Sequence, residues 1–199
     1  MRSSLRFAHF IRAAACASIV VLSSAATHAA NAPERTLLAE PPRALTDFEL
    51  TSHEGKPVRL SQLRGTPLIV FFGFAHCPTV CPAALQELRQ LERQHKAELG
   101  KARIVIISVD GERDTPAAMA EWLKPISKNF LGLTGSPAKV REIAREFSAA
   151  FYKTPGKTPN DYLVEHNAQI FVVNSRGQLH ATFFNAPVAT MAQVARSVM

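Results

Sequence analysis

Cysteine is scarce in this chain of 199 residues, which has only three. Cys16 lies in an N-terminal segment that has the features of an export signal. Removal of that segment leaves Cys77 and Cys81, with three residues between them. No other sulfur donor of this kind then competes with the pair, so the pair is the first candidate for redox chemistry or metal binding.

Acidic residues are absent from the first thirty positions, which carry three arginines. The apolar stretch Ala13–Ala26 is shorter than the roughly 20 residues that a membrane span needs. Small residues at the spacing of a signal-peptidase site follow it and end at Ala29. We therefore expect residues 1–29 to be a signal peptide, with an uncleaved N-terminal anchor as the alternative.

The chain has no block of lysine or arginine, although its formal net charge is +7. Removal of residues 1–29 takes three basic and no acidic residues, which leaves 20 basic and 16 acidic residues and a net charge of +4. So mild and scattered a charge gives no support for nucleic-acid binding. A weak preference for an acidic protein partner is compatible with it.

One domain is expected after the export segment. Residues 30–42 are polar and contain prolines, which predicts a linker, and residues 43–199 alternate between strand-like and helix-like segments. This order predicts an α/β sandwich with a mixed central sheet flanked by helices. A cysteine motif after the first core strand, at the start of the next helix, is the thioredoxin arrangement.

The expected elements follow from periodicity, caps and turn residues. A hairpin is expected around residues 53–56, an exposed loop at 154–161, and a second hairpin that turns at 174–177. The other expected elements are strands at 67–75, 103–109 and 131–134, and helices at 82–99, 115–123, 136–147 and 188–198.

The Cys77–Cys81 pair permits either a disulfide or a shared metal ion. Residues four apart on a helix have Cα atoms roughly 6 Å apart, which is within the range of a disulfide. A bridge over three residues restrains the unfolded chain very little, so a purely structural disulfide is the less favoured interpretation. The unpaired N–H groups of a helix N-terminus favour thiolate, the form that binds soft metals and attacks disulfides.

Imidazole is a suitable third ligand for a copper(I) ion held by two thiolates. Spacing alone leaves every histidine after the export segment as a candidate, each with a surface or hydrogen-bonded role as its alternative: His53, His76, His95, His166 and His180. The ring of His76 is expected to point away from Cys77, because adjacent side chains on an extended segment point in opposite directions.

Charged residues follow the second core strand at Asp110, Arg113 and Asp114. Composition favours a solvated loop that caps the next helix. The functional alternatives are a docking edge and a set of charges close to the sulfurs.

These segments together resemble the Sco/SenC family of copper-handling proteins. The resemblance covers roughly Pro42 to the C-terminus and is carried by matching segments in the same order: Phe72–Pro82, Ser108–Pro116, Asp161–His166 and the strand and turn through Gly177. A lone pair of cysteines at this spacing would be a weak signal, but the joint pattern is specific.

The resemblance implies a thioredoxin-like, monomeric protein of the periplasm, secreted or tethered to the inner membrane. It implies that Cys77, Cys81 and His166 bind copper, as Cu(I) and, where the thiolates persist, as Cu(II). The implied partner is subunit II of cytochrome c oxidase, whose dinuclear copper site such proteins assemble, or another periplasmic copper protein. Thr79, Gly111 and Glu165 depart from the family pattern without removing a ligand.

The alternative function is that of an enzyme, a thiol–disulfide reductase that keeps the cysteines of that subunit reduced. Cys77 would then attack and Cys81 would resolve the mixed disulfide. A peroxidase of the same fold is disfavoured, because peroxiredoxins place a threonine three residues before the attacking cysteine, where Phe74 and Pro78 stand here.

Overall fold

A computed structural model describes residues 34–78, 80–156 and 161–198 of the chain. The expected export segment and Thr79 lie outside these residues. No helix in the described ranges is both long and apolar enough to cross a membrane. The described residues belong to one compact unit, Ala32–Met199.

The centre of the fold is an eight-stranded mixed sheet in the order β1-β10-β9-β4-β5-β6-β2-β3. Strand β4 pairs parallel with β5, β5 pairs parallel with β6, and the other neighbours are antiparallel. The strands are β1 (Arg35–Ala44), β2 (Glu49–Ser52), β3 (Pro57–Arg59), β4 (Leu68–Gly73), β5 (Arg103–Ser108), β6 (Leu131–Thr134), β9 (Ile170–Val173) and β10 (Gln178–Phe184).

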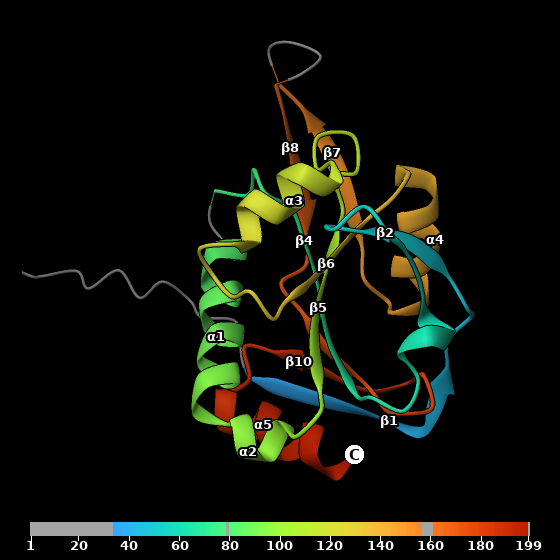
Figure 1. Cartoon of the computed structure of the whole chain (residues 1–199), viewed down its shortest axis with the longest axis vertical. Helices are drawn as coiled ribbons and strands as arrows, with labels where there is room; N and C mark the ends of the chain where they lie inside the picture. The colour runs from blue at the N-terminus through green and yellow to red at the C-terminus, as the bar shows by residue number, and fades with distance from the viewer. Residues whose placement is uncertain (1–33, 79, 157–160, 199) are drawn as a thin grey trace, which may run out of the picture. The chain divides into compact units, whose positions relative to one another are not determined.

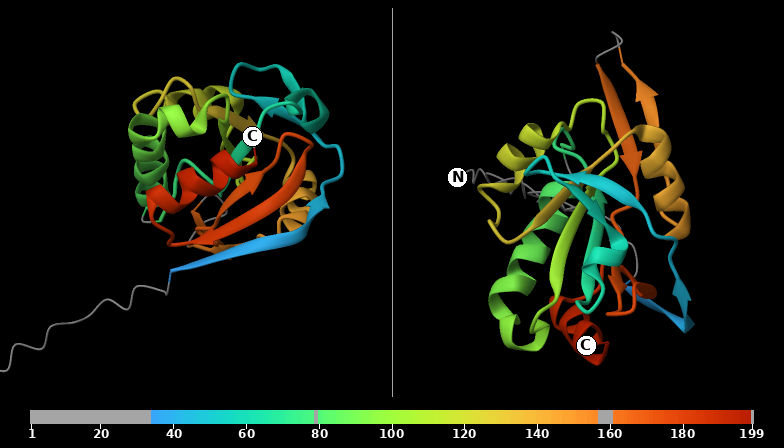
Figure 2. Two further views of the ribbon diagram at one scale, coloured as in Figure 1. Left: turned by 90° about the horizontal axis from the view of Figure 1, so that it is seen from below. Right: turned by 45° about the vertical axis from the view of Figure 1, so that its right-hand side comes forward.

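Helices cover both faces of this sheet, with α1 and α4 on opposite sides (Figures 1 and 2). Helix α5 packs against α1 and α2. The helices are α1 (Val80–Gln94), α2 (Lys96–Leu99), α3 (Pro116–Leu123), α4 (Pro137–Glu146) and α5 (Val188–Ser197), with a 3-10 helix η1 (Leu60–Leu63).

Strand β4 carries the core because every one of its residues is buried. Its β-branched and aromatic side chains suit a strand that is covered on both faces. Phe72 packs edge-to-face with Phe147 and Phe171, at ring-centroid distances of 5.3 and 5.9 Å. The end of β4 is therefore packed into the core, and the cysteine motif begins four residues after it.

The capped starts of α3 and α4 predicted from the sequence are confirmed, whereas α1 begins at Val80 rather than at residue 82. Thr115 accepts a hydrogen bond from the backbone N–H of Ala118 at 3.2 Å, and Ser136 accepts one from that of Lys139 at 3.3 Å. Each cap is followed by proline at the first helical position, where the missing N–H costs nothing.

Three local expectations are corrected. Residues 35–42, expected within a linker, belong to strand β1, which pairs with β10 at the edge of the sheet. The expected helix 82–99 is divided at His95 into α1 and α2. The segment expected as an exposed loop contributes to a further hairpin, β7 (Phe151–Pro155) and β8 (Tyr162–His166), which forms its own two-stranded sheet.

Candidate metal centre

The two cysteines lie where β4 leads into α1. Cys81 is in the first turn of α1, and its side chain is 1 % exposed, whereas Cys77 lies in the preceding loop and is half-buried. The backbone N–H of Cys81 points at the sulfur of Cys77, with a distance of 3.4 Å. Both thiols are free. One sulfur is thus enclosed by the core and the other lies at the surface.

His166, the last residue of β8, meets the cysteine pair. Its Nε2 lies 3.1 Å from the sulfur of Cys81 and 3.7 Å from that of Cys77. Phe71 and Phe74 contact the imidazole edge-to-face, at ring-centroid distances of 6.0 and 5.6 Å. The two phenylalanine rings pack against the imidazole in an orientation in which Nε2 faces both sulfurs.

The tautomer of His166 follows from its other ring nitrogen. Nδ1 lies 3.1 Å from the backbone carbonyl oxygen of Asn167, which can only accept a hydrogen bond. The proton therefore resides on Nδ1, and Nε2 keeps its lone pair toward the sulfurs. Burial lowers the pKa of His166 and so favours this neutral form.

Cys81 behaves differently from what its helix position predicts. Burial raises the pKa of its thiol, and the neighbouring Cys77 raises it further. Desolvation therefore outweighs the helix terminus, and the metal-free protein holds Cys81 as a thiol. A soft metal ion would reverse this preference, because coordination deprotonates a thiol.

Gly73 provides the space for the sulfur of Cys81. A Cβ atom at this position would lie 2.6 Å from Cε1 of Phe71 and 3.0 Å from Sγ of Cys81. Sequence analysis did not assign this role, although a glycine inside a strand is a recognised signal of close approach. The absence of a side chain at Gly73 thus lets the thiol of Cys81 pack against β4.

The two aspartates of the charged loop after β5 are buried while Glu112 is exposed, which corrects the expectation of a fully solvated loop. Asp110 and Asp114 are 1 % and 0 % exposed. One carboxylate oxygen of Asp114 accepts hydrogen bonds from the hydroxyl of Ser108 (2.6 Å) and the backbone N–H of Ala75 (3.1 Å). Asp114 therefore ties the end of β5 to the chain just before Cys77, and its burial raises the pKa of the carboxyl group.

His76 turns away from the cysteine pair, as expected. Its Nδ1 is 3.8 Å from the second carboxylate oxygen of Asp114, and its side chain is 55 % exposed. His76, Asp110 and Asp114 form a separate group of potential ligands. Both oxygens of Asp110 already accept hydrogen bonds from other side chains, whereas the second oxygen of Asp114 is buried without a hydrogen-bond partner in the described part of the chain.

The remaining described histidines lie elsewhere. His53 accepts a hydrogen bond from the backbone N–H of Gly132 at 3.0 Å, and His95 lies 3.6 Å from the carboxylate of Glu98. His180 is on β10. Among the described residues, the group of potential ligands that contains both sulfurs has His166 as its only imidazole.

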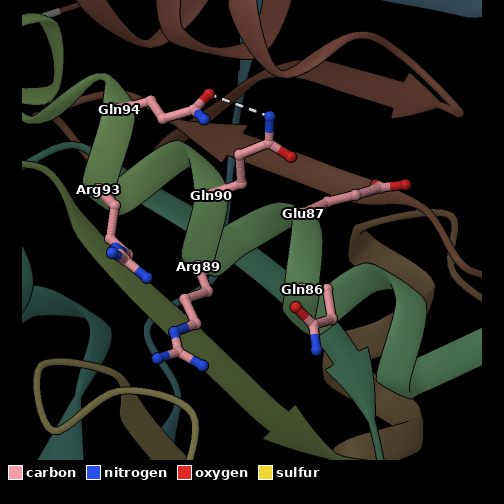
Figure 3. A pocket seen from close by; sticks show the side chains of 6 residues that line it. All are labelled: Gln86, Glu87, Arg89, Gln90, Arg93 and Gln94. Atoms are coloured by element: carbon pink, nitrogen blue, oxygen red, sulfur yellow. Dashed lines mark hydrogen bonds between the residues drawn. The ribbon is translucent and has the colours of Figure 1, made fainter.

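A surface depression of about 530 Å³ lies on the outer face of α1 (Figure 3). Its lining consists of polar and charged side chains from that single helix: Gln86, Glu87, Arg89, Gln90, Arg93 and Gln94. It contains no thiol or imidazole, so it offers a soft metal ion no suitable ligand.

Comparison with known proteins agrees with this geometry. A family model described as SCO1/SenC matches residues 38–199. The mitochondrial SCO2 homologue of Bos taurus is 36% identical over 133 residues, which cover 66% of this chain and 50% of the relative. The chain spans about half the length of the mammalian SCO2 relatives it matches.

Solved structures give the same assignment and confirm the thioredoxin-like α/β fold. Bradyrhizobium japonicum ScoI with copper bound has 32% identity and a TM-score of 0.71, over 78% of this chain and 99% of that one. BsSco is a member of the Sco family of cytochrome c oxidase assembly proteins in which a disulfide switch has been identified. It has 27% identity and a TM-score of 0.65, over 79% of this chain and 94% of that one. The chain belongs to the SCO1/SenC family.

Proposed function

We propose that this protein is a periplasmic copper chaperone that binds Cu(I) through Cys77, Cys81 and His166. The observation that carries the proposal is the position of His166 Nε2, 3.1 and 3.7 Å from the two sulfurs. Two thiolates and one neutral imidazole are a donor set that suits copper. Copper-bound relatives of similar fold support the same metal.

The proposed recipient is subunit II of cytochrome c oxidase, at its dinuclear copper site. Support comes from the description of BsSco as belonging to a family of cytochrome c oxidase assembly proteins. Copper would move by ligand exchange, without net oxidation or reduction. The half-exposed Cys77 would be replaced first by an incoming thiolate, and the buried Cys81 would be released last.

Copper titration tests the ligand set. Cu(I) is titrated into wild type, His166→Ala and the matched control His180→Ala, in competition with a Cu(I) chelator. Loss of one ligand should weaken binding in His166→Ala by at least about 10- to 100-fold, the cost of removing even a residue that only orients a ligand, while His180→Ala should bind like wild type. Equal affinities for wild type and His166→Ala would remove His166 from the site.

A second candidate function is thiol–disulfide reduction, favoured by the unequal exposure of the two sulfurs. The Cys77 thiolate would attack a client disulfide, forming a mixed disulfide and releasing one client thiolate. Cys81 would then attack the sulfur of Cys77, forming a Cys77–Cys81 disulfide and releasing the second client thiol. The protein is oxidised by two electrons and the client is reduced by two.

Metal-free protein separates the two candidates. Reduction of a disulfide-bonded peptide by metal-free wild type, at a rate retained in His166→Ala, would favour the reductase. A rate no higher than that of a Cys77→Ser variant would leave the chaperone as the supported function.

A further inference from the structure

The hairpin that carries His166 is not a part of the central sheet. Within the described residues, β7 pairs only with β8, and the pair forms its own two-stranded sheet. The hairpin extends beyond the end of the central sheet (Figures 1 and 2). Its backbone hydrogen bonds fix its internal register, and contacts with neighbouring segments of the chain help to fix its position relative to the cysteines.

Besides the packing of His166 against Phe71 and Phe74, several of these contacts come from the loop after β5. Nη1 of Arg113 donates a hydrogen bond to the backbone carbonyl of Tyr162 at 3.1 Å, and the guanidinium lies over the Tyr162 ring, 3.8 Å from its centroid. Nε of Arg113 pairs with the carboxylate of Asp110. The Tyr162 hydroxyl donates a hydrogen bond to the other oxygen of Asp110 at 2.6 Å. The three residues close a ring of contacts between loop and hairpin.

This ring has the geometry of a rigid support. Asp110 is buried and accepts from both partners, so neither carboxylate oxygen is left unpaired. Nε and Nη1 of the planar guanidinium donate hydrogen bonds while its face lies over the Tyr162 ring, and the buried Nη2 has no partner among the described residues. Outside it, Lys153 of β7 pairs with Glu112 and lies 4.3 Å from the centroid of the Tyr162 ring.

Tyr162 and His166 lie on the same face of β8. Side chains alternate along a strand, and the two residues are separated by an even number of positions, with the buried Val164 between them. A hairpin held at Tyr162 is therefore held on the face that presents the imidazole to the sulfurs.

We propose that Arg113 is a positioning residue for the copper ligand His166, acting through Asp110 and Tyr162. It touches neither copper nor the sulfurs; it holds β8 at Tyr162, at the turn end of the hairpin, so that Nε2 at the other end of the strand stays within reach of both. The inference rests on the proposed copper-binding function. It gives the charged loop after β5 the role of positioning a ligand, where composition alone favoured a solvated loop that caps the next helix.

The first test is a pair of double-mutant cycles read by Cu(I) affinity. Arg113→Gln removes the contacts of the guanidinium with Asp110 and Tyr162. Tyr162→Phe removes only the hydrogen bond from the hydroxyl to Asp110 and keeps the aromatic ring under the guanidinium. Each is measured alone and combined with His166→Ala. We expect Arg113→Gln to weaken Cu(I) binding about tenfold when His166 is present and to have no further effect in the His166→Ala protein.

A general loss of structure would weaken binding equally in both backgrounds, and that result would overturn the proposal. Arg59→Gln is the matched control, because Arg59 pairs with Glu49 on the exposed β2–β3 hairpin, which carries no ligand. It should leave Cu(I) affinity unchanged.

The second test needs no copper. NMR signals of the ¹⁵N-labelled imidazole of His166 are compared in the metal-free wild type, Arg113→Gln and Tyr162→Phe. The proposal predicts shifted or broadened signals in both variants, with the larger change in Arg113→Gln. Unchanged signals overturn it. Shifted signals without any effect of His166→Ala on copper affinity would support the positioning role and contradict the proposed ligand set instead.

Discussion

His166 illustrates how one hydrogen bond prepares a side chain for soft-metal chemistry. The carbonyl of Asn167 holds the Nδ1 proton, and burial lowers the pKa of the imidazole, so that Nε2 is a free donor near neutral pH. Cys81 is prepared in the opposite sense, because burial raises the pKa of its thiol. His166 can therefore bind a metal ion without losing a proton, whereas Cys81 must first lose its thiol proton.

This asymmetry predicts a pH dependence of copper binding. Copper must displace the proton of Cys81, so the apparent Cu(I) affinity should rise with pH by at least about tenfold per unit between pH 6 and 8, the slope for release of one proton. Chelator competition across this range measures the slope. An affinity that is flat with pH would mean that Cys81 is already a thiolate in the metal-free protein.

Gly73 carries a prediction at the same scale. Gly73→Ala places a methyl group 2.6 Å from the ring of Phe71 and 3.0 Å from the sulfur of Cys81, in a strand that is fully buried. We expect overpacking to lower the free energy of unfolding by about 1–3 kcal/mol and to weaken Cu(I) binding. Urea unfolding measures the first effect, and an unchanged midpoint would contradict the close packing of Gly73 against Cys81.

At the scale of elements, local patterns predict the core well. The apolar run of β4 and β5, the turn between β9 and β10, and the capped starts of α3 and α4 all follow from residues within a few positions of one another. Strand β1 does not, because it contains prolines and pairs with the distant β10 across a register shift between Leu38 and Arg43. Proline is tolerated at such an edge, so composition alone cannot tell this strand from a linker.

The β7–β8 hairpin was missed for a related reason. Proline and glycine at Pro155 and Gly156 indicate a loop, and the outward face of the hairpin is exposed, so neither strand has a buried apolar run. It contacts Arg113 and Asp110, about fifty residues earlier in the chain. Such long-range contacts leave no periodic trace in the sequence.

The separate sheet predicts different dynamics for the hairpin. Backbone amides of β8 should exchange with solvent faster than those of β4 in the metal-free protein, because β4 is buried and paired on both sides. Cu(I) should slow exchange in β8, since His166 would then link it to α1. Hydrogen-exchange mass spectrometry with and without Cu(I) measures both effects. Equal protection of β4 and β8 without metal would show that the hairpin is not an independent unit.

At the scale of the whole molecule, the site depends on two distant segments of the chain that the fold brings together. Cys77 and Cys81 follow the first core strand, and His166 arrives 85 residues after Cys81, at the end of a hairpin. Spacing left five histidines as candidates, and resemblance to the Sco/SenC family singled out His166. The structure adds the physical reason: among the described residues, the fold brings His166 within 4 Å of both sulfurs.

X-ray absorption at the copper edge tests this convergence most directly. Protein loaded with one equivalent of Cu(I) should show two sulfur ligands and one nitrogen ligand per copper ion, and His166→Ala should lose the nitrogen while keeping both sulfurs. Wild-type copper with sulfur ligands alone, or with a nitrogen ligand that survives in His166→Ala, would contradict the three-residue site.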